Sequence, residues 1–347
     1  MRQVLALLLD SARLLRSRSL FWICLGISAF AAIALFGTYT FNPDGVRFLW
    51  FKTTANPALS LGTTGPRMFV SFMFSEVFVQ YWLSWGAIIL AIVSTASILP
   101  DFLADGAIEL ALCKPISRAK LFLVKWLAAV IFTAAQVTLG VGIAYLLVRW
   151  NTGVWLHATL LAIPAIMLQF VYLYCIGALI AVLTRSTIAS LIGTLLFWFM
   201  VFIVQFSANQ LTGIVAQLDV QATRQQARGA AQAAEETRSE AATWRKWQTI
   251  LVDAKAVVPK TGDLQKIVSN LNETPTAIDF LELMSTGRQR AHPPKLDDAQ
   301  WKDVQDASRI AERAIRDINL YYSLGTSLAF TVVVIGAATF IFVRRDA

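Results

Sequence analysis

The chain has 347 residues, of which 56% are hydrophobic and 15% are charged, and its mean hydropathy is +0.59. Soluble domains average roughly 45–50% apolar and about 25% charged residues, so the composition excludes an ordinary soluble protein and indicates an integral membrane protein. The net charge of +8 could suggest a nucleic-acid partner. The basic excess lies mainly in short loops between apolar stretches, however, which predicts membrane topology and no nucleic-acid partner.

Six apolar stretches with almost no charged residues follow one another along the chain. A membrane helix needs about 20 apolar residues, because a rise of about 1.5 Å per residue must cross about 30 Å of hydrocarbon. We therefore predict an all-α polytopic membrane protein in contact with the lipid bilayer. The predicted spans lie at about 20–39, 79–99, 123–148, 158–183, 187–207 and 321–343.

The residues before the first span carry apolar side chains at helical spacing, from Val4 to Leu15. This pattern predicts an interfacial helix that leads into the membrane, and the alternative is a simple extension of the first span. The first apolar stretch is too long for a signal-peptide core, so we predict a retained signal-anchor helix.

The distribution of basic residues predicts the orientation of the spans. Placing the N-terminus in the cytosol puts most of the basic loop residues inside, and an even number of spans then puts both termini in the cytosol. The short outer loops hold only Arg47, Lys52, Arg67 and Arg149.

Two segments are predicted to lie outside the membrane on the outer side. Residues 40–78 are rich in glycine, proline and aromatic residues, which predicts surface-lying or re-entrant pieces. Residues 207–320 have balanced charges and form a helical, hairpin-like extracytoplasmic insertion between spans five and six, whose first helix continues from span five. Apolar stripes at residues 244–258 and 301–318 are predicted to pack on each other, and two short amphipathic helices are predicted between them.

The sequence lacks the motifs of common enzymes. No glycine-rich phosphate loop is present, and His157 and His292 have no partners at metal-ligand spacing. We therefore predict no catalytic residue, no metal site and no cofactor in this chain. Three amides lie within the predicted spans, and they either join helices or line a translocation path; they are Gln136, Gln169 and Gln205.

The segment "DGAIELALCKPISRAKLFLVKW", residues 105–126, separates the second and third predicted spans. Its acidic residues precede its basic ones, which suits a short helix whose N-terminus favours anions, and Pro115 ends that helix. A positive-inside connector would explain the basic residues. It would not explain Glu109, Gly106 or Pro115.

This segment resembles the corresponding part of ATP-binding-cassette (ABC) type-2 permeases. The matching positions are Gly106, Ile108, Glu109, Lys114, Pro115, Ile116, Ser117, Arg118 and Lys125. The span layout, "VVPKTGDL" and the C-terminal "FIFVRRD" are similar too, in particular to the permeases of multicopper-enzyme maturation and gliding-type exporters. Ala107 departs from the hydroxyl residue usual there, and the Ala/Gln-rich outer portion is longer than in simple members.

The resemblance implies the permease subunit of an ATP-driven exporter in the bacterial cytoplasmic (inner) membrane. ATP is bound by cytosolic ABC ATPase subunits, and the permease pairs with a second copy or a related permease. The predicted units are the first part of the membrane domain at 1–206, an extracytoplasmic helical domain at 207–320, and the last span with a cytosolic tail at 321–347. The first unit contains a coupling loop at 101–122. The extracytoplasmic domain offers a surface for an outer partner. The implied coupling residues are Asp105, Gly106, Glu109, Lys114, Pro115, Ser117 and Arg118. The alternative function is a membrane-anchored scaffold or sensor that acts through 207–320.

Overall fold

The computed structural model describes residues 13, 19–48, 54–55, 57–60, 62–103, 117–153, 155–275, 280, 309–310, 313, 315 and 319–344. In this part of the chain, five helical segments are long and apolar enough to cross a membrane. They correspond to the last five predicted spans, so a polytopic helical membrane protein is confirmed. Their bounds are Gly65–Leu103, Arg118–Thr152, His157–Thr184, Thr187–Ala227 and Leu320–Arg344.

Helix α2 (Ser19–Phe36) occupies the place of the first predicted span. It has 18 residues, and its apolar part, Phe21–Phe36, is shorter than the five segments above. The helix packs against α7, where Phe21 meets Phe132 with ring centroids 5.4 Å apart. A sixth crossing stays a prediction, and the interfacial helix predicted before it lies, except for Arg13, outside the described residues.

A small antiparallel sheet, which was not predicted, follows α2 in this otherwise helical fold. Strands β1 (Tyr39–Asn42), β2 (Gly45–Phe48) and β3 (Thr54–Ala55) lie in the order β1-β2-β3. The first turn closes at Gly45, whose φ of 135° favours glycine. Tyr39 and Phe41 alternate inward and pack on the ring of Phe69. A short 3-10 turn, η1 (Pro57–Leu59), leads to the next helix.

The second predicted span is longer and less regular than expected. Helix α3 (Gly65–Phe72) begins well before residue 79 and continues into η2 (Met73–Ala87), α4 (Ile88–Thr95) and α5 (Ile98–Leu103). Segment η2 is a π-helix, a wide helix that is rare and often occurs at functional sites.

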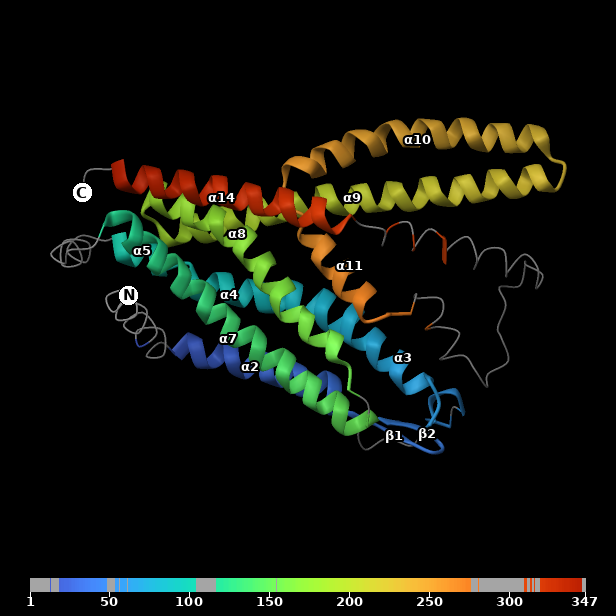
Figure 1. Ribbon diagram of the computed structural model, residues 1–347, viewed down its shortest axis with the longest axis horizontal. Coiled ribbons are helices and arrows are strands. Elements are labelled where there is room, and N and C mark those ends of the chain that lie inside the picture. Colours follow the sequence, from blue (N-terminus) through green and yellow to red (C-terminus); the bar gives the residue numbers. More distant parts are fainter. Residues whose placement is uncertain are drawn as a thin grey trace.

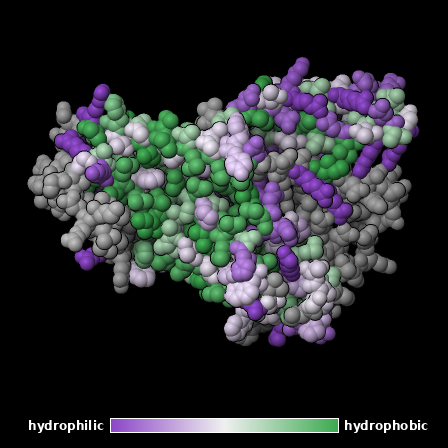
Figure 2. Space-filling view, in the orientation of Figure 1, coloured by the Kyte–Doolittle hydropathy of each residue, from purple (hydrophilic) through white to green (hydrophobic). Residues whose placement is uncertain are grey.

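The remaining spans surround this segment. Helix α7 (Arg118–Thr152) ends at Gly153, whose φ is 72°, as is usual for glycine after a helix C-terminus. The turn η3 (His157–Leu161) leads into α8 (Ala162–Thr184), and α8 packs against both α9 (Thr187–Ala227) and α14 (Leu320–Arg344). Hydrophobic side chains cover this bundle (Figure 2).

Helix α9 extends far beyond the apolar bundle, which confirms that a long helix continues from span five. The chain turns at Gly229 (φ 82°), and α10 (Ala231–Val257) returns along α9 (Figure 1). The seam contains Ala222, Ala234 and Ala241, which are buried. Small side chains let the two helices approach closely.

The predicted pairing of the two apolar stripes stays a prediction, because most of the second stripe lies outside the described residues. Helix α10 packs on α9, and Trp247 of the first stripe is 56% exposed. Of the second stripe, residues 301–308, 311–312, 314 and 316–318 lie outside the described residues.

Helix α11 (Thr261–Leu271) confirms the first of the two short amphipathic helices. It leaves the hairpin and packs against α8, η2 and α9 (Figure 1). Of the second predicted short helix, residues 276–279 and 281–287 lie outside the described part of the chain.

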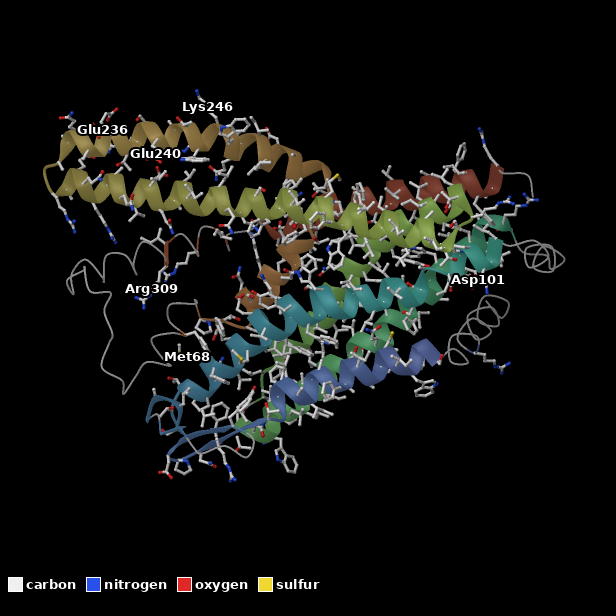
Figure 3. The ribbon with its side chains drawn as sticks, turned by 180° about the vertical axis from the view of Figure 1, so that it is seen from behind. Met68, Asp101, Glu236, Glu240, Lys246 and Arg309 are labelled. Atoms are coloured by element: carbon white, nitrogen blue, oxygen red, sulfur yellow. The ribbon has the colours of Figure 1, made fainter. Side chains whose placement is uncertain are left out.

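The molecule has two distinct ends. Asp101 of α5 lies at one end, and Glu236 and Glu240 of the hairpin lie at the other (Figure 3). The start of α2, the start of α7 and the end of α14 share the end that holds α5 (Figure 1).

Candidate functional site between the helix bundle and α11

A cavity of about 250 Å³ lies where α11 meets the bundle. Side chains from η2, α8, α9 and α11 line it. Three membrane helices and the short helix α11 therefore border one space. Two of the three predicted path residues, Gln169 and Gln205, contribute to the lining.

Gln169, one of the lining residues, has a buried hydrogen-bond acceptor without a partner among the described residues. The residue is 1% exposed, and its Nε2 donates to the backbone carbonyl oxygen of Ser84 at 3.1 Å. Its Oε1 atom is buried and has no hydrogen-bond partner among the described residues. A buried carbonyl oxygen without a donor is energetically costly, so this atom favours the approach of a donor group.

Gln205 has a different role, because both ends of its amide are occupied. Its Nε2 donates to the carbonyl oxygen of Pro259 at 2.8 Å and to Oγ1 of Thr261 at 3.3 Å. Its Oε1 accepts from the backbone N–H of Gly262 at 2.7 Å. A Cβ atom on Gly262 would lie 2.8 Å from Oε1, so glycine permits this close approach. Gln205 therefore fixes the start of α11 against α9.

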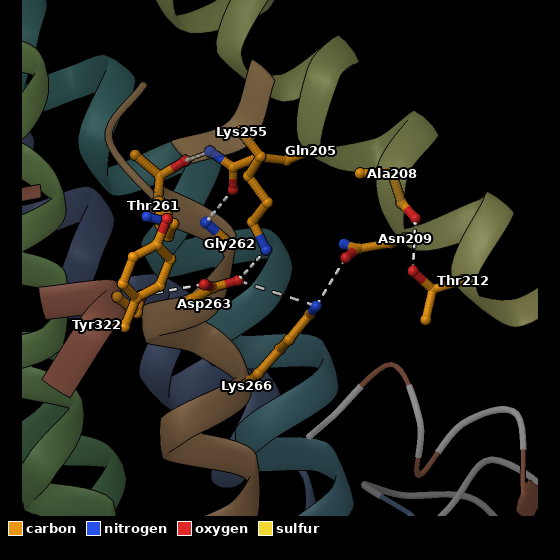
Figure 4. Close-up of polar contacts among 12 residues, drawn as sticks. Gln205, Ala208, Asn209, Thr212, Lys255, Thr261, Gly262, Asp263, Lys266 and Tyr322 are labelled. Carbon is orange, nitrogen blue, oxygen red and sulfur yellow. Dashed lines mark hydrogen bonds and ion pairs between the residues drawn. The ribbon is translucent and has the colours of Figure 1, made fainter. Parts of the chain in front are cut away.

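Asp263 contacts positively charged and polar groups from three elements, α10, α11 and α14 (Figure 4). Its Oδ1 lies 2.6 Å from Nζ of Lys255 and 4.0 Å from Nζ of Lys266, and its Oδ2 accepts from the hydroxyl of Ser323 at 3.0 Å. Lys266 also donates to Oδ1 of Asn209 at 2.7 Å. Burial, and then the nearby Lys255, lower the pKa of Lys266 to about 8 despite the opposing effect of Asp263.

Lys260 joins the turn before α11 to α14. Its backbone N–H donates to Ser327 at 2.9 Å, and its Nζ donates to Thr326 at 2.5 Å. The ammonium also lies 4.3 Å from the centre of the Tyr322 ring, a cation–π distance. Burial lowers the pKa of Lys260. A second space of about 200 Å³ separates this cluster from α9.

The far end of α11 is tied to α3 and η2. Ser269 donates to a carboxylate oxygen of Glu76 at 3.3 Å, and Thr274 contacts Ser75 at 2.8 Å. The hydroxyl of Ser71 donates to the carbonyl oxygen of Asn272 at 2.8 Å. Both ends of α11 are therefore anchored to the bundle, and the helix covers one side of the cavity.

Aromatic rings of η2 and α9 also line the cavity. The rings of Trp85 and Trp198 lie 4.7 Å apart, and Phe202 meets Trp85 edge-on at 4.8 Å. Phe206 continues this row and is 50% exposed on the outer face of α9. The lining of the cavity is thus amphipathic, because it combines amides and charged groups with aromatic rings.

Comparison with known proteins gives one result that decides the family. Residues 68–347 match the profile of "ABC-2 family transporter protein". The chain belongs to this ABC-2 family. Searches of curated proteins and of solved structures found no match.

Membership identifies the chain as a multi-pass permease subunit of an ABC transporter. It also implies association with an ATP-binding ABC subunit and with membrane lipid. The family points to a transport subunit rather than an enzyme. The matched region includes η2, α8, α9 and α11, so the whole cavity lies within the family domain.

The predicted coupling residues of this ABC-2 permease lie mostly beyond the described residues. Asp105, Gly106, Glu109, Lys114 and Pro115 fall in the undescribed range 104–116. Ser117 has an extended backbone and precedes α7, whose first residue is Arg118.

Helices α5 and α7 flank the predicted coupling segment. Phe102 of α5 and Phe122 of α7 both pack on Phe342 of α14, with ring centroids 6.2 and 5.5 Å apart. The flanking helices therefore meet α14 near this segment.

Gln136 lies apart from the cavity in the permease. Its Nε2 donates to the hydroxyl of Ser28 at 3.2 Å and to the carbonyl oxygen of Ala87 at 3.3 Å. It thus joins α7 to α2 and η2, and it is not among the lining residues. A path role for the three glutamines stays a prediction.

Sequence reasoning missed several lining residues of the permease. Glu76 was placed in an outer loop, because the second span was predicted to begin near residue 79, whereas the helix begins at Gly65. Trp85 falls at the outer end of the second predicted span, as an aromatic residue at the membrane interface does, and no sequence signal distinguishes Trp198 within the fifth predicted span. No group of three or more metal-ligating side chains occurs in the part of the chain that the structure describes.

Proposed function

We propose that this ABC-2 permease is the membrane subunit of an ATP-driven exporter. A separate cytosolic ATPase hydrolyses ATP, and the permease converts that cycle into translocation by alternating access. The family match over residues 68–347 carries this proposal. In it, six spans place both termini on the cytosolic side of a bacterial inner membrane, and the α9–α10 hairpin lies on the extracytoplasmic side. Assignment to the multicopper-maturation and gliding-type group stays a prediction.

The coupling segment is proposed to receive the ATPase at residues 105–118. Glu109 and Arg118 would form charge pairs with the ATPase surface, since charge complementarity selects partners and fixes register. Movement of this segment would displace α5 and α7, which contact α14 through Phe342.

Helix α14 offers a route from this end of the molecule to the cavity. Near its other end, Ser323 and Ser327 bind Asp263 and the backbone of Lys260. A shift of α14 would therefore move the start of α11, which covers the cavity. This rigid connection is our proposed link between ATP hydrolysis and access to the site.

A second permease copy, or a related permease, is proposed to pack on α9 and α14. Only 22% of the apolar window of α9 and 28% of that of α14 are buried, against 61% for Gly65–Leu103. These two helices therefore have the most surface available for lipid or for a partner.

The coupling proposal is tested by co-expressing the permease with its ABC ATPase subunit. We expect Glu109→Lys and Arg118→Glu each to weaken co-purification by about tenfold or more and to reduce ATP hydrolysis by the complex, since like charges at an interface cost several kcal/mol. Lys246→Glu is the control, because Lys246 lies on the hairpin (Figure 3). Unchanged association and hydrolysis in both variants would remove the coupling assignment.

A further inference from the structure

In the amphipathic cavity between η2, α8, α9 and α11, some polar side-chain atoms have hydrogen-bond partners among the described residues and others do not. Two of its lining residues are ionisable, Glu76 and Lys266. The Lys266 ammonium is held by Asn209 at 2.7 Å and faces Asp263 at 4.0 Å. The Gln205 amide is committed to the turn before α11. Among the described side chains of this lining, Oε1 of Gln169 is a buried acceptor without a hydrogen-bond partner.

These observations describe what a complementary ligand must supply. It must donate a hydrogen bond to a buried carbonyl oxygen, because that atom has no donor among the described residues. Glu76 adds a carboxylate on the same lining, which favours a donor that is positively charged. The faces of Trp85 and Trp198 attract cations and also pack against apolar groups.

Two lining residues of the cavity differ in depth. Gln169 is 1% exposed, whereas Phe206, on the same lining, is 50% exposed on α9. A ligand can therefore place its polar head near Gln169 while an apolar group lies along the aromatic row.

We infer that this cavity is a binding site for a primary ammonium ion that carries an apolar or aromatic group. Its N–H groups donate to Gln169 and Glu76, and its apolar group lies on Trp85, Trp198 and Phe202. The inference rests on the proposed function in one respect, namely that such a molecule is the cargo.

Binding is measured on the intact permease in lipid nanodiscs without any ATPase. The probes are 2-phenylethylammonium, its N-trimethyl analogue and 2-phenylethanol, titrated by calorimetry with saturation-transfer NMR as a second readout. The trimethyl probe keeps the charge and has no N–H donor, and the alcohol keeps a donor and has no charge. We expect the primary ammonium to bind at least about tenfold more tightly than either analogue.

Variants separate the two polar contacts. Gln169→Met is expected to weaken binding of the primary ammonium about tenfold and to leave the trimethyl probe unchanged. Gln169→Glu retains an acceptor and is expected to bind the primary ammonium at least as well as the wild type. Glu76→Gln is expected to weaken both cations and spare the alcohol.

Gln136→Met is the matched control. Gln136 is also buried, with an unpartnered Oε1, yet it does not line the cavity. Equal losses in Gln136→Met and Gln169→Met, or no saturable binding of 2-phenylethylammonium to the wild type, would overturn the ligand site. Neither result would affect the coupling proposal, whose own readout is association with the ATPase.

Discussion

Asp263 is the residue on which the cluster at the start of α11 depends. Its side chain is 5% exposed and accepts from Lys255 at 2.6 Å, while the side chains of Lys255 and Lys266 are 15% and 14% exposed. Removing one member of a buried pair leaves an uncompensated charge, which costs about 3–5 kcal/mol. We therefore expect Asp263→Asn to lower the midpoint of thermal unfolding substantially.

Asp219→Asn is the control for this prediction. Asp219 pairs with Arg245 at 2.8 Å, but the two side chains are 49% and 53% exposed, and exposed pairs contribute about 0–1 kcal/mol. Thermal unfolding of both variants, purified in the same detergent, makes the comparison. Equal shifts would contradict the assignment of Asp263 as a buried anchor.

At the residue scale, two polar residues of the cavity could be predicted from the sequence, whereas their hydrogen bonds could not. Gln169 and Gln205 could be selected because amides inside apolar spans need partners. Their different roles could not be predicted, because Gln205 is occupied by Pro259, Thr261 and Gly262, which are distant in the sequence. Only the folded chain shows that Gln169 keeps an acceptor.

At the element scale, the α9–α10 hairpin is held by an alanine seam. Ala241 is 1% exposed, whereas the adjacent Ala242 is exposed. A larger side chain in a tightly packed seam typically costs about 1–3 kcal/mol. We expect Ala241→Leu to open the hairpin and to speed hydrogen exchange of α10, as measured by mass spectrometry.

Ala242→Leu adds the same atoms one residue away and should leave exchange unchanged. If both variants exchange at the wild-type rate, the seam does not control the stability of the hairpin. The comparison is internal, since the two positions share one helix.

The same hairpin shows why its pairing could not be predicted. Apolar periodicity favoured a seam built on Trp244, Trp247 and Leu251, but the helices meet through alanines and through Arg245 and Asp219. Alanine is compatible with either face of a helix, so its pattern does not distinguish a seam from a solvated face. The small sheet was missed for a simpler reason: the Asp44–Gly45 pair is a hairpin signal that was read as part of an irregular outer loop.

At the scale of the whole molecule, the spans could be predicted from hydropathy, whereas their irregular parts could not. Five predicted spans correspond to long apolar helices, because the length of an apolar stretch is a local property. The π-helix η2 and the return of α11 to the bundle depend on packing among α8, α9 and η2. The cavity arises from these two features.

The buried lysines of this cavity region predict how the stability of the whole protein changes with pH. Burial lowers the pKa of Lys266 from 10.5 to about 8, so between these values the unfolded chain binds more protons than the folded chain. Stability should therefore rise as pH increases from about 8 to 10.5, by about 3 kcal/mol if Lys266 acts alone. Thermal unfolding between pH 7 and pH 10 measures the slope. Lys266→Met should flatten it, and Lys246→Met should not; equal slopes in all three proteins would contradict the assignment.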